Sequence, residues 1–333
     1  MKKQWFRMAA ATLLVMLLVG CGASGGLAGS ADSIRLGLSM ASRDDFLIEV
    51  ERAAVGAATE AEVALDSINA DGDQQAQLAQ IEAWADEGYA AAIVVLCEAA
   101  AAGEVLDRAG TMPVVFLNRQ PEDLSVLQSR ANVLYIGSPE QDAGQMQGEF
   151  LAEYFLSQPQ SGVSDLHSPR IAVIEGDTRG NASAARIAAA KQAMTDAGLE
   201  PVYLFEQDAG WQRSQAQELF AEFLKETPEI DAVLAANDAM GLGASDALAQ
   251  AGYAIASIPI VGVDATAAGR AAIRDGRLNF TVFQDAQAQG AGAVEAAMRM
   301  LGGTPLDQAD NIQWIAYHPV DASNIDQLFP DDR

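Results

Sequence analysis

The chain has 333 residues, of which 50% are hydrophobic and 20% are charged, enough for two domains or one large α/β unit with a sizeable core. Twenty Lys and Arg stand against 46 Asp and Glu, a formal charge of −26. This charge repels phosphate backbones and anionic lipids, so it excludes a nucleic-acid binder and a basic peripheral membrane patch. Two histidines and two cysteines exclude a zinc cluster and a disulfide framework.

The first segment has the pattern of an export signal. Lys2, Lys3 and Arg7 precede a run without charges from Met8 to Val19, which is too short for a permanent membrane-spanning helix. We therefore expect residues 1–20 to be a signal peptide.

Cys21 directly follows this run in the sequence Leu-Val-Gly-Cys, which resembles the lipobox of bacterial lipoproteins. The resemblance implies lipidation of Cys21, followed by a flexible, small-residue tether over 21–33. The alternative is a plain secretory signal in which Cys21 has no role.

From residue 34 onward, short apolar runs typical of strands alternate with helix-length segments, such as 46–61, 74–87 and 140–156. Continuous apolar strands between helices indicate parallel sheets that are covered on both faces. The predicted strands cover 34–38, 63–66, 92–96, 114–117, 134–137, 171–174, 202–205, 232–235, 260–263 and 279–283.

Ten strands are many for one sheet, and the segment from Pro159 to Pro169 is loop-like. We therefore predict an α/β fold with two doubly wound parallel-sheet lobes. A single large Rossmann-like sheet is the alternative. Cys97 lies at the end of an apolar run, so it is interpreted as an inert core cysteine.

Ligands of doubly wound sheets bind outside the carboxyl ends of the strands. The residues that follow the predicted strands form a set of carboxylates, amides and guanidinium groups. The rule selects Asp44 with Phe46, Asn118 with Arg119, the segment from Gly176 to Arg186, Asn237 with Asp238, Asp264, and Gln284 with Asp285, and Trp211 follows a further strand.

This set suits binding better than catalysis. It lacks a histidine, an attacking cysteine and a Gly-x-Ser-x-Gly motif, and neither a Walker loop nor a Gly-x-Gly-x-x-Gly motif is present. Asp44 and Asp264 as a glycosidase pair would be the enzymatic alternative.

Carboxylate, amide and guanidinium groups pair with the hydroxyls of a neutral polyol, and Phe46 and Trp211 would cover the C–H face of a sugar ring. Each residue also has a structural interpretation, because Phe46 could be core and any one Asp or Arg could form a surface ion pair.

Several segments resemble the periplasmic sugar-binding proteins of the ribose and galactose/glucose type, from Ile34 to about Leu328. The matching segments are PVVFLNRQ at 113–120, AANDAMGLGA at 235–244, IPIVGVD at 258–264 and TVFQD at 281–285.

The resemblance implies a periplasmic binding protein-like fold of type I. It also implies ligand contacts at Asp44, Phe46, Asn118, Arg119, Arg186, Trp211, Asn237, Asp264 and Gln284.

Some positions depart from the galactose type of this family. Val95 replaces an asparagine, and Gly180 and Ala182 replace a histidine and an aspartate. The calcium loop has no counterpart around Ser161 to Pro169, so no metal or cofactor is expected.

The resemblance also implies the domain organisation. We expect an N-terminal lobe of 34–137 plus 286–311 and a C-terminal lobe of 138–285 plus 312–328. Three crossing strands, near Gly137, Gln284 and Asn311, would join them.

We therefore expect an exported, monomeric solute-binding lipoprotein on the membrane, in the periplasm or at the cell surface. It would bind a monosaccharide or similar polyol and serve an ABC permease, or a sensor or chemoreceptor. An enzyme on the same architecture is one alternative, and a regulator of the lactose-repressor type is another.

Overall fold

The computed structural model describes residues 34–157, 167–226, 229–303 and 310–332. The predicted signal peptide at 1–20 and the tether at 21–33 with Cys21 lie outside these ranges. Within the described ranges, no helix is both long and apolar enough to cross a membrane.

The first sheet is parallel throughout and has the strand order β11–β5–β4–β3–β1–β2. Apolar side chains on both faces explain why its central strands are fully buried. Its strands are β1 (Arg35–Met40), β2 (Ala64–Asn69), β3 (Ala91–Val94), β4 (Val114–Leu117), β5 (Val133–Gly137) and β11 (Ile312–Trp314).

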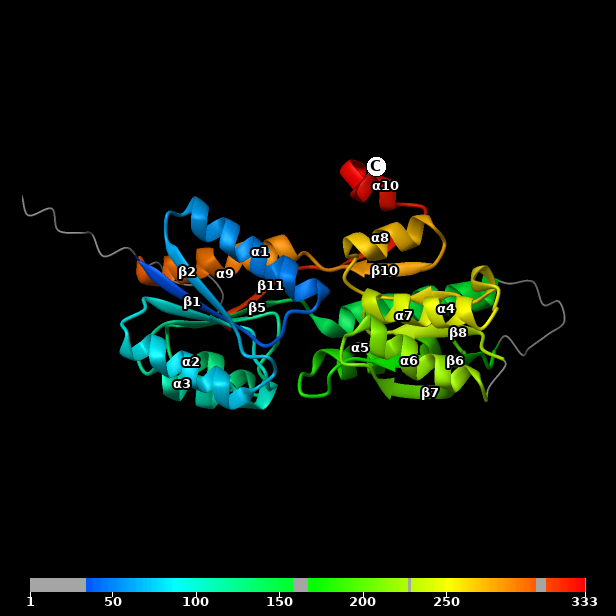
Figure 1. The fold of residues 1–333 in the computed structure, drawn as a ribbon, viewed down its shortest axis with the longest axis horizontal. Coiled ribbons are helices and arrows are strands. Elements are labelled where there is room, and N and C mark those ends of the chain that lie inside the picture. Colours follow the sequence, from blue (N-terminus) through cyan, green and yellow to red (C-terminus); the bar gives the residue numbers. More distant parts are fainter. Residues whose placement is uncertain (1–33, 158–166, 227–228, 304–309, 333) are drawn as a thin grey trace, which may run out of the picture. The chain divides into compact units, whose positions relative to one another are not determined.

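Helices cover both faces of this sheet (Figure 1). The helices α1 (Asp45–Glu60) and α9 (Ala286–Leu301) pack together on one face, although they are far apart in sequence. The other face carries α2 (Gln74–Asp86) and α3 (Ala102–Ala109). We call this sheet and its helices the first lobe.

The second sheet has the order β12–β10–β9–β8–β6–β7, and only its edge strand β12 is antiparallel. Pro319 in β12 fits an edge position, because proline has no N–H for a second neighbour. The strands are β6 (Arg170–Glu175), β7 (Val202–Asp208), β8 (Ala232–Ala235), β9 (Ile260–Val261), β10 (Phe280–Phe283) and β12 (His318–Asp321).

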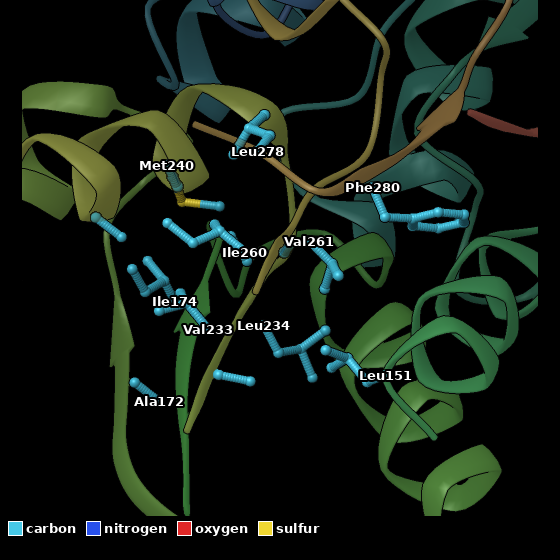
Figure 2. Packing of buried hydrophobic residues seen from close by; sticks show 14 of the residues in the cluster. Leu151, Ala172, Ile174, Val233, Leu234, Met240, Ile260, Val261, Leu278 and Phe280 are labelled. Atoms are coloured by element: carbon cyan, nitrogen blue, oxygen red, sulfur yellow. The ribbon is translucent and has the colours of Figure 1, made fainter. Parts of the chain in front are cut away.

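The helices of the second sheet pack in pairs, α4 with α5 and α6 with α7. Between the layers lies an apolar core in which Leu151 of α4 and Met240 of α7 approach the strands (Figure 2). This sheet and its helices form the second lobe. The helices are α4 (Glu140–Ser157), α5 (Ala182–Asp196), α6 (Arg213–Leu224), α7 (Asp238–Gln250), α8 (Ala267–Arg274) and α10 (Ile325–Leu328); short 3-10 helices cover Ala99–Ala101, Leu124–Gln128, Ile255–Ser257 and Pro330–Asp332.

The two-sheet prediction is confirmed, and the single-sheet alternative is wrong. All ten predicted strands are present, while β11 and β12 were not predicted. One predicted boundary is also wrong. Ile312–Trp314 pairs in parallel with Tyr135–Gly137 of the first sheet, so residues 312–314 belong to the first lobe. The third crossing therefore follows Trp314 and does not lie near Asn311.

Candidate functional site

All nine side chains predicted as ligand contacts line one cavity, together with Leu47, Glu140 and Ala182. The fold explains this convergence, because the loops at the carboxyl ends of parallel strands meet at one edge of each sheet. Asp44 and Phe46 follow β1, Asn118 and Arg119 follow β4, Arg186 lies on α5 after β6, Trp211 lies between β7 and α6, and Asn237, Asp264 and Gln284 follow β8, β9 and β10.

Asp44 has a structural role as well as a place in the cavity. Its Oδ1 accepts hydrogen bonds from the backbone N–H groups of Phe46 and Leu47, at 3.1 and 2.8 Å, and so caps α1. Among the described residues, its Oδ2 accepts one hydrogen bond, a long one of 3.4 Å from Ser42. One oxygen therefore fixes the loop, and the other retains capacity for a ligand.

Asn118 and Arg119 also use part of their hydrogen-bonding capacity within the protein. The Nδ2 of Asn118 donates to Gln289 at 3.1 Å, while Nη1 of Arg119 donates to the carbonyls of Leu96 and Cys97, each at 3.2 Å. The Oδ1 of Asn118 and the remaining guanidinium donors of Arg119 keep capacity for a ligand.

The position of the Trp211 indole depends on Gly176, against which the ring packs. A Cβ on Gly176 would lie 2.4 Å from the indole, so only glycine lets the ring lie this close to the backbone. The guanidinium of Arg186 lies 5.7 Å from the centroid of the Trp211 ring. This arrangement presents a half-buried aromatic surface at the cavity.

Asp264 places a buried carboxylate in the cavity. It is 5% exposed, and among the described residues its carboxylate accepts no hydrogen bond; Oδ1 lies 4.0 Å from Nη1 of Arg186. Burial raises the pKa of this carboxyl well above its ordinary value, and the positive charge of Arg186 opposes the shift. The nearby carboxyls of Asp238, Asp44 and Glu140 raise the pKa further.

Arg186 is held by residues that the sequence analysis missed. Its Nε donates to Glu140 at 2.6 Å, and its Nη2 donates to Tyr317 at 3.1 Å and to Gln284 at 3.2 Å. Tyr317 in turn donates to Glu140 at 2.8 Å. Glu140 lies three residues after the predicted strand at 134–137, but the sequence pattern assigns it to the start of the predicted helix at 140–156. Tyr317 lies on a crossing segment that does not follow a predicted strand.

Asn237 and Asp238 have different tasks. The Oδ1 of Asn237 caps α7 by accepting from the N–H of Met240 at 2.9 Å, which leaves its Nδ2 for a ligand. Asp238 points into the second lobe, where it accepts from Thr281 at 2.6 Å and from the N–H of Thr266 at 3.0 Å. Burial raises the pKa of Asp238 to about 7.

Three cavity residues have left-handed backbone conformations, with φ values of 62° at Asn118, 67° at Trp211 and 110° at Asp264. Such conformations cost about 1–3 kcal/mol for residues other than glycine and gather at functional sites. Their concentration here indicates a site rather than an incidental gap in the packing.

The cavity itself has a volume of about 40 Å³, which gives room for only a few water molecules. It adjoins an open groove of about 1160 Å³ that shares Asp44, Arg119 and Trp211 as lining residues. A ligand of sugar size would therefore enter from the groove only when the lining groups separate.

Cys97, interpreted as a core cysteine, is fully buried, and burial raises the pKa of its thiol to about 11. In the described part of the chain, no group of three or more His, Cys, Asp or Glu side chains is placed to hold a metal ion.

Comparison with known proteins decides the family. Residues 36–305 match the family model described as a periplasmic binding protein domain. The chain belongs to the periplasmic binding protein family. This membership confirms the predicted family and the expectation of a binding protein rather than an enzyme, and it implies export to the periplasm.

Relatives of this periplasmic binding protein include a putative rhizopine-binding protein of Rhizobium meliloti. It is 32% identical over 200 residues, which are 59% of this chain and 60% of the relative, less than two thirds of its length. The D-ribose/D-allose-binding protein of Pseudomonas aeruginosa is 28% identical over a stretch that covers 75% of this chain and 76% of that protein.

A solved relative has the same fold over nearly the whole body. The solute-binding protein of an ABC transporter from Bacillus halodurans, solved with bound myo-inositol, is 26% identical and has a TM-score of 0.79. The match covers 90% of this chain and 98% of that one. The periplasmic binding protein fold of type I is thereby confirmed.

Proposed function

We propose that this chain binds a neutral, polyhydroxylated ligand, a monosaccharide or similar polyol, in the cavity between its lobes. The observation that carries this proposal is that two buried polar groups lack hydrogen-bond partners among the described residues. The carboxylate of Asp264 accepts no hydrogen bond from the described residues, and Nε2 of Gln284, which is 2% exposed, has no partner. Buried polar groups are normally paired, so both call for partners from a ligand.

The free hydrogen-bonding capacity matches hydroxyl groups in particular. The cavity offers acceptors at Asp264, Asp44 Oδ2 and Asn118 Oδ1, next to donors on Arg119 and Gln284. A hydroxyl donates one bond and accepts others, so a polyol can satisfy both kinds of group. A ligand that carries only acceptors would leave the carboxylates unpaired.

Two aromatic side chains, one from each lobe, also suit a sugar ligand. Phe46 lies in the first turn of α1 in the first lobe and Trp211 precedes α6 in the second, and both line the cavity. Flat apolar faces suit the C–H surface of a sugar ring. Because one ligand would touch residues of both lobes, its binding favours the arrangement in which the lobes lie together.

The relatives support the same ligand class. Their names specify rhizopine and D-ribose or D-allose, and the solved relative holds myo-inositol. On this basis we propose that the chain delivers its ligand, as a monomer, to an ABC transporter permease. A sensor or chemoreceptor is the alternative partner.

We further propose that the mature protein is anchored by lipid at Cys21, with residues 21–33 as tether. Cys21→Ser should move the protein from the membrane fraction to the soluble fraction. Fractionation that finds both forms in the soluble fraction would contradict the anchor without affecting the ligand proposal.

The ligand class is tested by a thermal-shift screen of the mature protein against pentoses, hexoses and inositols. A ligand that binds only the folded state raises the melting temperature, by an amount that grows with its concentration above Kd. We expect at least one neutral sugar or polyol to do so. A panel in which only amino acids or anions raise it would overturn the proposal.

A further inference from the structure

Glu140 and Tyr317 form a buried polar cluster with Arg186 and Gln284 at the points where the chain passes between the lobes. Glu140 starts α4 just after the first crossing, Gln284 lies on the second, and Tyr317 lies on the third between β11 and β12. Glu140 and Tyr317 are buried, so the cluster is shielded from water.

The donors of Arg186 can be counted one by one. A guanidinium has five N–H groups. Nε donates to Glu140, Nη2 donates to Tyr317 and Gln284, and one N–H of Nη1 donates to the carbonyl of Ala236 at 2.8 Å. Four donors are therefore used by the protein, and the fifth lies on Nη1, the atom closest to Asp264.

The same bonds fix the side-chain amide of Gln284. Its Oε1 accepts from Arg186, and its buried Nε2 has no hydrogen-bond partner among the residues that the structure describes. Arg186 and Gln284 thus both offer donors to the cavity, while Asp264 beside them offers an acceptor. This pattern suits one hydroxyl that accepts from the two donors and donates to the carboxylate, or two neighbouring hydroxyls that share these tasks.

We propose that Glu140 and Tyr317 are positioning residues, which orient Arg186 and, through it, the amide of Gln284 toward one part of the ligand. This inference rests on the proposed polyol binding. Neither residue needs to touch the ligand, because each acts by fixing the guanidinium. The cluster also joins the ligand-facing arginine to segments at all three crossings, so it couples the site to the region that moves when the lobes separate.

The mildest probe of this cluster is Tyr317→Phe, which removes one hydroxyl and leaves the pair of Glu140 and Arg186 intact. Tyr203→Phe is the matched control, because Tyr203 lies on β7 and its ring contacts Lys191. Affinity is measured by calorimetry with the sugar or polyol that most raises the melting temperature of the wild type. We expect Tyr317→Phe to bind about tenfold more weakly, and Tyr203→Phe to bind like the wild type.

A positioning role is separated from a purely structural one by monodeoxy analogues of the same ligand. Gln284→Ala first identifies the hydroxyl whose removal no longer matters in that variant. Tyr317→Phe should lose discrimination at the same hydroxyl and keep it at the others. Glu140→Gln gives a second variant with nearly the same shape, and it should weaken discrimination at that hydroxyl too.

The outcomes are distinct. If Tyr317→Phe lowers the melting temperature but keeps the affinity and the discrimination of the wild type, the cluster is structural and the inference is overturned. If affinity and melting temperature both stay unchanged, it is overturned as well. If the wild type binds no polyol, the proposed function fails first, before any variant is compared.

Discussion

Arg179 of the second lobe donates from Nη1 to the backbone carbonyl of Gly72 in the first lobe, at 2.8 Å. Asp177 holds the guanidinium in place with bonds of 3.0 Å to Nε and 2.7 Å to Nη2. The carbonyl of Arg179 also accepts from the N–H of Ala99 at 3.1 Å. The loop after β6 therefore bridges the two lobes beside the cavity.

Because this bridge must break for a ligand to enter or leave, Arg179→Ala should accelerate both association and dissociation several-fold. Its effect on Kd should be smaller, since both directions change together. Stopped-flow tryptophan fluorescence measures these rates. Arg108→Ala is the control, because Arg108 is partly exposed and its partners Glu82 and Glu104 lie in its own lobe. Equal rates in wild type and Arg179→Ala would contradict the role of the bridge.

Gly176→Ala should displace the indole of Trp211, because the new Cβ would lie 2.4 Å from the ring. We expect affinity to fall about tenfold or more, comparable to Trp211→Ala, while the far-ultraviolet circular dichroism is unchanged. Gly103→Ala on α3 is the matched control, since a Cβ there meets nothing within 4 Å. If Gly176→Ala binds ligand like Gly103→Ala, the indole is not part of the site.

Ligand binding should tighten as pH rises, because of Asp264. Burial raises the pKa of this carboxyl in the free protein. Ligand hydroxyls that donate to the carboxylate stabilise its ionised form and so lower that pKa on binding. The complex then holds fewer protons than the free protein, and affinity increases with pH between the two pKa values. Calorimetry from about pH 4.5 to 8 measures this trend.

Asp264→Asn should remove most of this pH dependence, because the amide does not titrate. An affinity of the wild type that is constant or falls as pH rises would show that Asp264 does not accept ligand hydrogen bonds as a carboxylate.

The stability that Asp238 contributes to the folded state should decrease as pH rises. Burial raises its pKa from 3.8 to about 7. The folded protein therefore retains a proton that the unfolded chain releases above about pH 4, so the stability that this group contributes below that pH is lost as pH rises through 7. Asp238→Asn keeps the shape and removes the titration.

Denaturant unfolding at pH 5 and pH 8 measures this effect. Between the two pH values, the unfolding free energy of the wild type should fall relative to that of Asp238→Asn by on the order of 2 kcal/mol. The same change in both proteins would mean that the Asp238 carboxyl is ionised in the folded state at pH 5.

The sequence predicted the strands that consist of continuous apolar runs, such as Val114–Leu117 and Ala232–Ala235, because both faces of a parallel strand are buried. It did not predict β11, which has three residues, one of them polar. Nor did it predict β12, where His318 and Pro319 give no strand signal and the partner β10 supplies the pairing. Short edge strands depend on tertiary contacts that local patterns do not contain.

The site was predictable where a side chain follows a strand end, as with Asn118 and Asp264, because topology alone brings those positions together. Glu140 and Tyr317 were not, because their place beside Arg186 depends on how the crossing segments pack. A carboxylate at the start of the helix after the fifth strand was the only local signal for Glu140.

The central claim, that a polyol is bound through buried groups of both lobes, is tested most directly by calorimetric titration of Asp264→Ala. The titrant is the sugar or polyol that most raises the melting temperature of the wild type. Loss of a hydrogen bond to a charged group costs about 1.5–3 kcal/mol, so we expect affinity to fall at least about tenfold. Asp107→Ala, whose side chain is 82% exposed, should bind like the wild type. Unchanged affinity in a folded Asp264→Ala protein would contradict the account.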